Sequence, residues 1–116
     1  MKRKHEGFPD GIAVIYDNQH RGGVGDIPKD SLVLRHKLRY RERTVGINRY
    51  YAALQDNSRI DRMIRCLRKD DVSVLDVVNV ITSGSDDKYY RIAQIQYPED
   101  TEPAVMDISL ERIDVT

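Results

Sequence analysis

Tryptophan is absent from this chain of 116 residues, which has one phenylalanine and one cysteine. The single cysteine, Cys66, excludes an internal disulfide framework and leaves a reducing cytoplasm as the simplest setting. No apolar run approaches the roughly 20 residues that a membrane-spanning helix needs, so we expect no membrane partner. The basic start, Met1–Gly7, has no apolar segment behind it, and we therefore expect no signal peptide.

Recognisable reaction centres are also lacking. His5, His20 and His36 are scattered, and none stands near Cys66 in a metal-ligand pattern. Cys66 could be a nucleophile activated by His36, but a small apolar core residue is the favoured interpretation because free cysteine is commonly buried. The glycine-rich run Arg21–Gly25 lacks the Gly-Lys-Ser/Thr ending of a phosphate loop. We therefore predict no enzyme activity, no metal and no cofactor.

Charge is present in quantity and is unevenly distributed. The formal net charge is +0, from 19 basic and 19 acidic side chains. Residues 1–69 hold 16 basic and 8 acidic side chains, a net of +8, whereas residues 70–116 hold 3 and 11, a net of −8. Such asymmetry suggests a charged partner or a second copy of the same chain.

The longest strand signal carries much of the positive charge. Ile12–Tyr16 is a short β-branched apolar run, and residues 32–41 then alternate between a mostly apolar and a mostly cationic face. The cationic positions on this predicted strand are Arg35, Lys37, Arg39, Arg41 and, if the strand continues, Arg43.

Three interpretations of this cationic face stay open. It could follow a phosphate backbone, as in a small nucleic-acid-binding β-barrel. It could be a solvated face that prevents edge pairing. It could instead meet the acidic half of a neighbouring copy. Tyr50 and Tyr51 follow nearby and could serve any such interface.

Glycine and proline mark a long loop. Residues 17–30 contain Arg21, Gly22, Gly23, Val24 and Gly25 together with Pro28, which predicts a long flexible connection of the kind that is often functional. Residues 1–9 read as a flexible N-terminal arm, and 50–55 as one or two helical turns. Residues 59–67 fit either an amphipathic helix or a strand, with the helix having the cleaner apolar stripe.

The remaining segments read as strands. They are residues 72–81, rich in valine, residues 89–97, and the alternating run Met106–Leu110, which predicts a half-buried strand. We predict one domain over residues 1–116. The fold class is mainly β, a small antiparallel β-barrel of five to seven strands with a long loop and at most one short helix.

Several stretches in fixed order look familiar. They are Asp10–Tyr16, Glu42–Ala53, Arg59–Arg65, Tyr89–Tyr97 and Pro103–Arg112. Together they resemble the head-tail connector proteins of tailed phages, in the stopper or head-completion family, over roughly residues 10–113. The motifs are structural rather than catalytic, so their order and spacing carry the resemblance.

The resemblance implies a virion protein that assembles in the host cytoplasm as a homo-oligomeric ring. The ring would lie below the portal and adaptor proteins, retain the packaged DNA without reading its sequence, and dock the tail proteins. It implies that a long loop reaches the channel, for which Arg21–Gly25 is the candidate. The same resemblance favours a strand over residues 59–67, and the low helix content favours stopper over adaptor.

Overall fold

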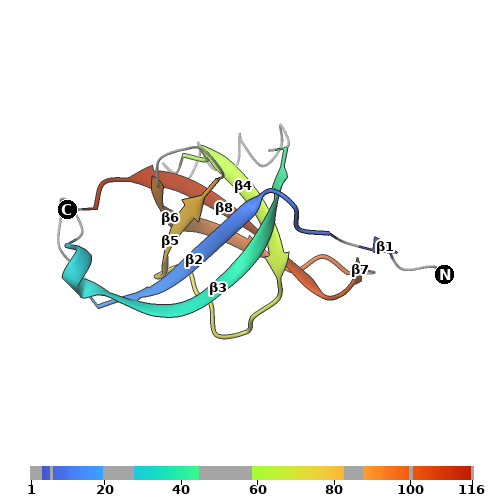
Figure 1. Cartoon of the computed structure of the whole chain (residues 1–116), viewed down its shortest axis with the longest axis horizontal. Helices are drawn as coiled ribbons and strands as arrows, with labels where there is room; N and C mark the ends of the chain where they lie inside the picture. The colour runs from blue at the N-terminus through green and yellow to red at the C-terminus, as the bar shows by residue number, and fades with distance from the viewer. Residues whose placement is uncertain are drawn as a thin grey trace.

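Six long strands form a closed antiparallel barrel in this protein. The computed structural model describes residues 4–5, 7–19, 28–44, 59–82, 88–99 and 101–115. The order around the barrel is β2-β3-β4-β8-β6-β5, so β2 and β5 close the sheet (Figure 1). This confirms the predicted fold class. The strands are β2 Gly11–Asn18, β3 Leu32–Arg43, β4 Arg62–Leu67, β5 Val77–Ile81, β6 Lys88–Gln96 and β8 Val105–Ile113.

Two short strands lie outside the barrel. β1, Lys4–His5, pairs in parallel with β7, Thr101–Glu102, which interrupts the connection between β6 and β8. Figure 1 shows this pair projecting to one side. The predicted arm over residues 1–9 therefore contains a paired strand. The only helical turn in the described ranges is the 3-10 turn Lys29–Ser31.

The interior is filled by apolar side chains from all six barrel strands. Ile15, Tyr40, Ile64, Ile92 and Ile108 are all at least 99% buried and come from five different strands. Cys66 belongs to the same cluster. Burial of this apolar surface supplies the main favourable term for folding.

The segment over residues 59–67, which fitted either a helix or a strand, is a strand from Arg62 to Leu67. Met63, Ile64 and Cys66 lie in β4, which pairs with β3 on one side and β8 on the other. A strand between two partner strands can form backbone hydrogen bonds on both of its edges, which satisfies its N–H and C=O groups. β-Branched and apolar residues also favour the extended form. The predicted loop 17–30 is shorter than expected, since β2 continues through Asn18 and the 3-10 turn begins at Lys29.

The predicted strand over residues 72–81 is wrong in its first half. Only Val77–Ile81 is extended, and the residues before it form a turn. The carboxylate of Asp76 accepts the backbone N–H of Ser73 at 3.0 Å, and the Ser73 hydroxyl accepts the N–H of Leu75 at 3.3 Å. Serine and aspartate side chains of this kind compete with a strand ladder for backbone groups.

The expectation that Met106–Leu110 is half buried is also wrong. Every residue from Val105 to Leu110 is buried, including Asp107 at 6% exposure and Ser109 at 0%. Asp107 is compatible with burial because Arg65, its cross-strand neighbour on β4, pairs with it. Alternation alone does not distinguish a solvated polar position from a paired one.

The two halves of the sequence occupy two arcs of the barrel. β2, β3 and β4 are consecutive around it, and so are β8, β6 and β5. The first arc carries seven basic and two acidic side chains on its strands, a net of +5. The second carries three basic and two acidic, a net of +1. The acidic excess of residues 70–116 therefore lies mainly outside the barrel strands.

Gly11 gives a direct test of how tightly β2 is held. Its φ is +154°, and an added Cβ would lie 2.4 Å from the carbonyl oxygen of Ile81 and 2.9 Å from the Tyr40 ring. We expect Gly11→Ala to lower the free energy of unfolding by about 2 kcal/mol or more, measured by urea denaturation. Gly7→Ala is the control, since nothing lies within 4 Å of that Cβ, and should change it by less than about 0.5 kcal/mol. Equal effects would contradict the close approach.

Candidate functional site

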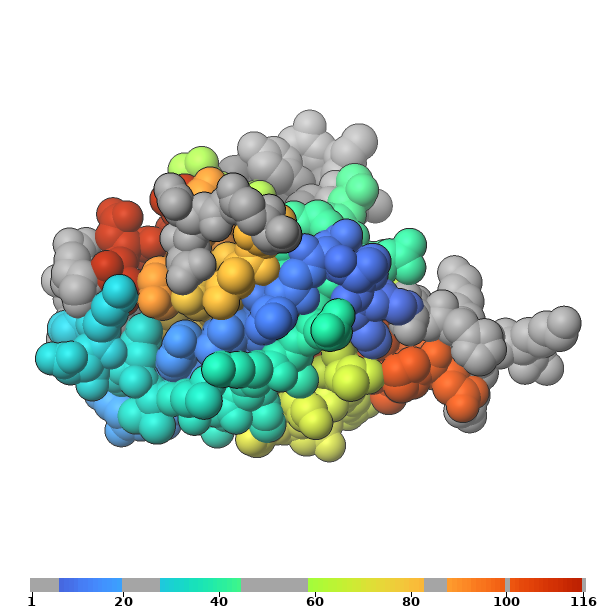
Figure 2. Space-filling model, viewed as in Figure 1, coloured from blue at the N-terminus to red at the C-terminus, as the bar shows by residue number. Residues whose placement is uncertain are grey.

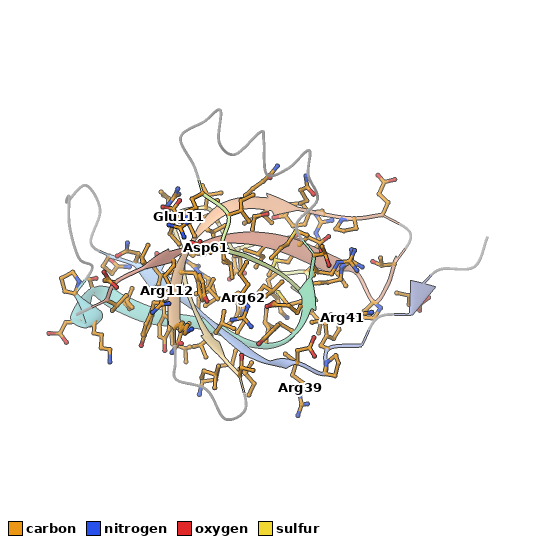
Figure 3. The ribbon with its side chains drawn as sticks, turned by 90° about the horizontal axis from the view of Figure 1, so that it is seen from above. Arg39, Arg41, Asp61, Arg62, Glu111 and Arg112 are labelled. Carbon is orange, nitrogen blue, oxygen red and sulfur yellow. The ribbon has the colours of Figure 1, made fainter. Side chains whose placement is uncertain are left out.

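The outer face of β3 carries four basic side chains at alternate positions. Lys37, Arg39 and Arg41 are exposed and Arg43 is half buried, whereas Leu38 and Tyr40 between them are buried. Alternate residues on a strand are about 6.8 Å apart. In Figure 3, Arg39 points away from the barrel. These four residues are called the cationic row below.

Three members of the row form no ion pair with any residue that the structure describes. Within the described ranges, no ion pair involves Lys37, Arg39 or Arg43. The acidic residue of the same strand, Glu42, does not neutralise them. Its carboxylate accepts a hydrogen bond at 3.0 Å from Arg62, whose side chain lies within the barrel in Figure 3. The row therefore presents positive charge to whatever lies outside.

Arg35 does not belong to this row, although the sequence placed it there. Ile15 pairs with His36, but the next residue, Tyr16, pairs with Leu34, so Arg35 is an extra residue in β3. Such a β-bulge changes the direction in which the following or preceding side chains point. The prediction of one uninterrupted cationic face over residues 35–43 therefore fails at its first member.

The bulge brings Arg35 to three carboxylates. Its guanidinium nitrogens lie 3.3 Å from Asp17, 3.3 Å from Asp76 and 3.8 Å from Asp71. The next residue, His36, contacts Asp71 through Nε2 at 2.7 Å. This contact lowers the pKa of Asp71. Arg35 thus ties β3 to β2 and to the turn before β5, which is a structural role.

A second arginine outside the row is compensated in the same molecule. Arg65 faces Arg41 across β3 and β4, and two such cations side by side would repel one another. The Arg65 guanidinium binds the Asp107 carboxylate through two hydrogen bonds of 2.7 and 3.0 Å, and both residues are 6% exposed. A bidentate pair of this kind satisfies a buried charge that would otherwise be very unfavourable.

Two exposed apolar residues flank the centre of the row. Arg39 pairs in register with Ile12 on β2, which is 41% exposed. Leu67 is the last residue of β4 and is 37% exposed. It comes directly after Cys66, which pairs with Tyr40, the residue that follows Arg39 on β3. Sequence reasoning missed both residues, because register between strands cannot be read from one strand's pattern. The resulting surface combines positive charge with aliphatic groups.

The connection between β6 and β8 exposes negative charge. Residues 97–99 and 101–104, called the acidic connection below, contain two carboxylates and no basic side chain. Glu99 and Glu102 are exposed, and in the described part of the chain neither is in an ion pair. Figure 2 shows this segment in orange, protruding from the body of the barrel. Arg68 contacts both ends of this segment. Its guanidinium lies over the Tyr97 ring, and its backbone N–H donates a hydrogen bond to the carbonyl oxygen of Ala104.

Cys66 lies in the core, as the favoured interpretation expected. It is fully buried, and burial raises the pKa of its thiol to about 12. The described residues contain no group of three His, Cys, Asp or Glu side chains placed to hold a metal ion. They also contain no helix long and apolar enough to cross a membrane. The predicted loop residues Arg21–Gly25, and Tyr50 and Tyr51, lie outside the described residues.

Comparison with known proteins adds no relationship. No protein-family model matches the chain, and no curated protein matches it.

The burial of Cys66 predicts an unreactive thiol. Because the thiolate is the reacting species, a pKa of about 12 leaves almost none of it at pH 8. We expect a disulfide reagent such as dithionitrobenzoate to label the native protein at least about a hundredfold more slowly than the urea-unfolded protein. Free glutathione at the same concentration gives the reference rate. Rapid labelling of the native chain would restore the nucleophile interpretation.

The different roles of Arg35 and Arg39 predict different effects on stability. Arg35→Met leaves the buried Asp76 carboxylate without its cation. Because the Arg35 side chain is partly exposed, we expect a moderate loss of about 1–3 kcal/mol in the free energy of unfolding. Arg39→Met removes a cation that has no ion pair among the described residues, and should change it by less than about 0.5 kcal/mol. Urea denaturation at pH 7 measures both. A larger loss from Arg39→Met would mean that the roles are reversed.

Proposed function

We propose that this chain is a structural subunit of a phage head-tail connector. In this role it forms a ring below the portal and adaptor, closes the DNA-filled head and docks the tail. The resemblance over residues 10–113 suggested this role and implied a small β-barrel. The chain does form a closed barrel of six antiparallel strands, so its architecture is compatible with the role.

One observation carries the proposal beyond the resemblance. A ring is built from heterologous contacts, in which one surface of each copy meets a different surface of the next. This chain has two such surfaces of opposite charge, the cationic row and the acidic connection, and each includes exposed charges that are unpaired among the described residues. Complementary charges orient copies as they approach one another and suppress wrong pairings.

Nucleic-acid binding is the second candidate function, and the cationic row favours it. Cations at alternate positions on an exposed strand can follow a phosphate backbone, and their affinity would fall steeply with salt. In a connector the same row could line the channel. A tight and salt-sensitive gel shift by the isolated protein would favour this second function, since a ring subunit needs only weak, non-specific contact with DNA.

The connector role predicts a specific assembly defect. Disrupting the coding sequence in the particle that carries it should yield heads and separate tails, because no docking surface would join them. We expect tailed particles to fall by at least about a hundredfold in electron micrographs, with head DNA becoming accessible to nuclease. Supplying the wild-type chain in trans is the control and should restore tails. Normal numbers of tailed, DNA-filled particles without this chain would overturn the proposal.

A further inference from the structure

We propose that the cationic row, with Arg39 at its centre, binds the acidic connection of a second copy of this chain. This inference rests on the proposed function, in which copies contact one another in a ring. It goes further by naming both surfaces of the contact. The cationic surface consists of Lys37, Arg39 and Arg41 together with the flanking Ile12 and Leu67.

The composition of the cationic surface favours a protein partner. Arg39 stands beside Ile12 on the neighbouring strand β2, and on β4 the exposed Leu67 comes directly after Cys66, the partner of Tyr40. Arginine next to apolar groups is the composition found at the centres of protein interfaces, where burial of the aliphatic part adds to the charge contact. Single-stranded nucleic acids are bound by cations with aromatic side chains, on which bases stack. The cross-strand partner of Arg39, Ile12, is aliphatic.

The acidic connection has the complementary chemistry. It offers the exposed carboxylates of Glu99 and Glu102, and the exposed apolar or weakly polar surfaces of Tyr97, Pro103 and Ala104. Carboxylates can accept hydrogen bonds from the arginine guanidinium, and the apolar residues can cover Ile12 and Leu67. The two prolines of the connection limit its freedom before binding, which lowers the entropic cost of docking.

The contact is between copies rather than within one. Both ends of the connection are held in place, by Arg68 at Tyr97 and Ala104 and by the pairing of β7 with β1. In that position neither Glu99 nor Glu102 forms an ion pair with the row of its own molecule, as far as the described residues show. Both surfaces therefore stay open to another copy. Two different surfaces allow a heterologous contact, which can repeat around a ring.

Site-specific cross-linking tests the contact directly. The photoreactive residue benzoylphenylalanine replaces Leu67 in the full chain, which is mixed with 15N-labelled wild-type chain at high concentration in about 50 mM salt, where screening is weak. We expect irradiation to join position 67 to the labelled peptide over residues 97–104. Cross-links between copies that map elsewhere, or no cross-links, would overturn the inference. Connector function is judged separately by tail attachment, so the two can fail independently.

Charge exchange provides the second test. Arg39→Glu, and separately the double change Glu99→Lys with Glu102→Lys, should each weaken self-association at least about tenfold in sedimentation experiments. An equal mixture of the two variants should recover association, because each provides the surface that matches the other. Arg112→Glu, an exposed charge reversal on β8, is the matched control and should have little effect. Failure of the mixture to recover, or an equal loss in the control, would overturn the inference.

Discussion

Closure of the barrel is the constraint on which the other features depend. Ile12–Tyr16 of β2 pairs with Val77–Ile81 of β5, which removes the free edges of the sheet. The same closure brings the first and second arcs of the chain together. It also requires a close approach at Gly11, where the backbone of β5 and the ring of Tyr40 leave no room for a side chain. A 116-residue chain has a thin core, so closure lets a small number of side chains be fully buried.

Arginines at buried or crowded positions of this closed sheet have carboxylate partners, whereas several cations on its outer face have none among the described residues. The arginines whose positions would otherwise be unfavourable each have a carboxylate partner: Asp107 for Arg65, Glu42 for Arg62, and three aspartates for Arg35. The exposed Lys37 and Arg39 and the half-buried Arg43 have none within the described ranges. The uneven charge of the sequence is thus reduced by pairing within the fold. Among the described residues, the exposed charges without an ion pair include Lys37 and Arg39 on β3 and Glu99 and Glu102 in the connection between β6 and β8.

The sequence predicted the fold class and most strands because alternation and turn residues are local signals. The barrel strands β2, β3, β6 and β8 lie close to where their patterns placed them. Two features depend on neighbours that no local pattern specifies: Asp107 is buried because Arg65 lies opposite it, and Ile12 lies beside Arg39 because of strand register. The turn at Ser73 and Asp76 is local, but it lies within a valine-rich segment whose composition favours a strand. Four of the five predicted cationic positions share the outer face of β3, and Arg35 departs from them.

The extra residue at position 35 has a consequence for how this strand can vary. After position 35, the even-numbered residues of β3, such as Leu38 and Tyr40, face the interior. Before it, the even-numbered Leu34 pairs with the outward-facing Tyr16, so the inward and outward positions are exchanged. A one-residue deletion here would let the two strands pair without interruption while leaving every later side chain in place. Related chains could therefore differ in length at this position and still share the same barrel, and a pattern-based alignment that allows no gap there would misplace one end of the strand.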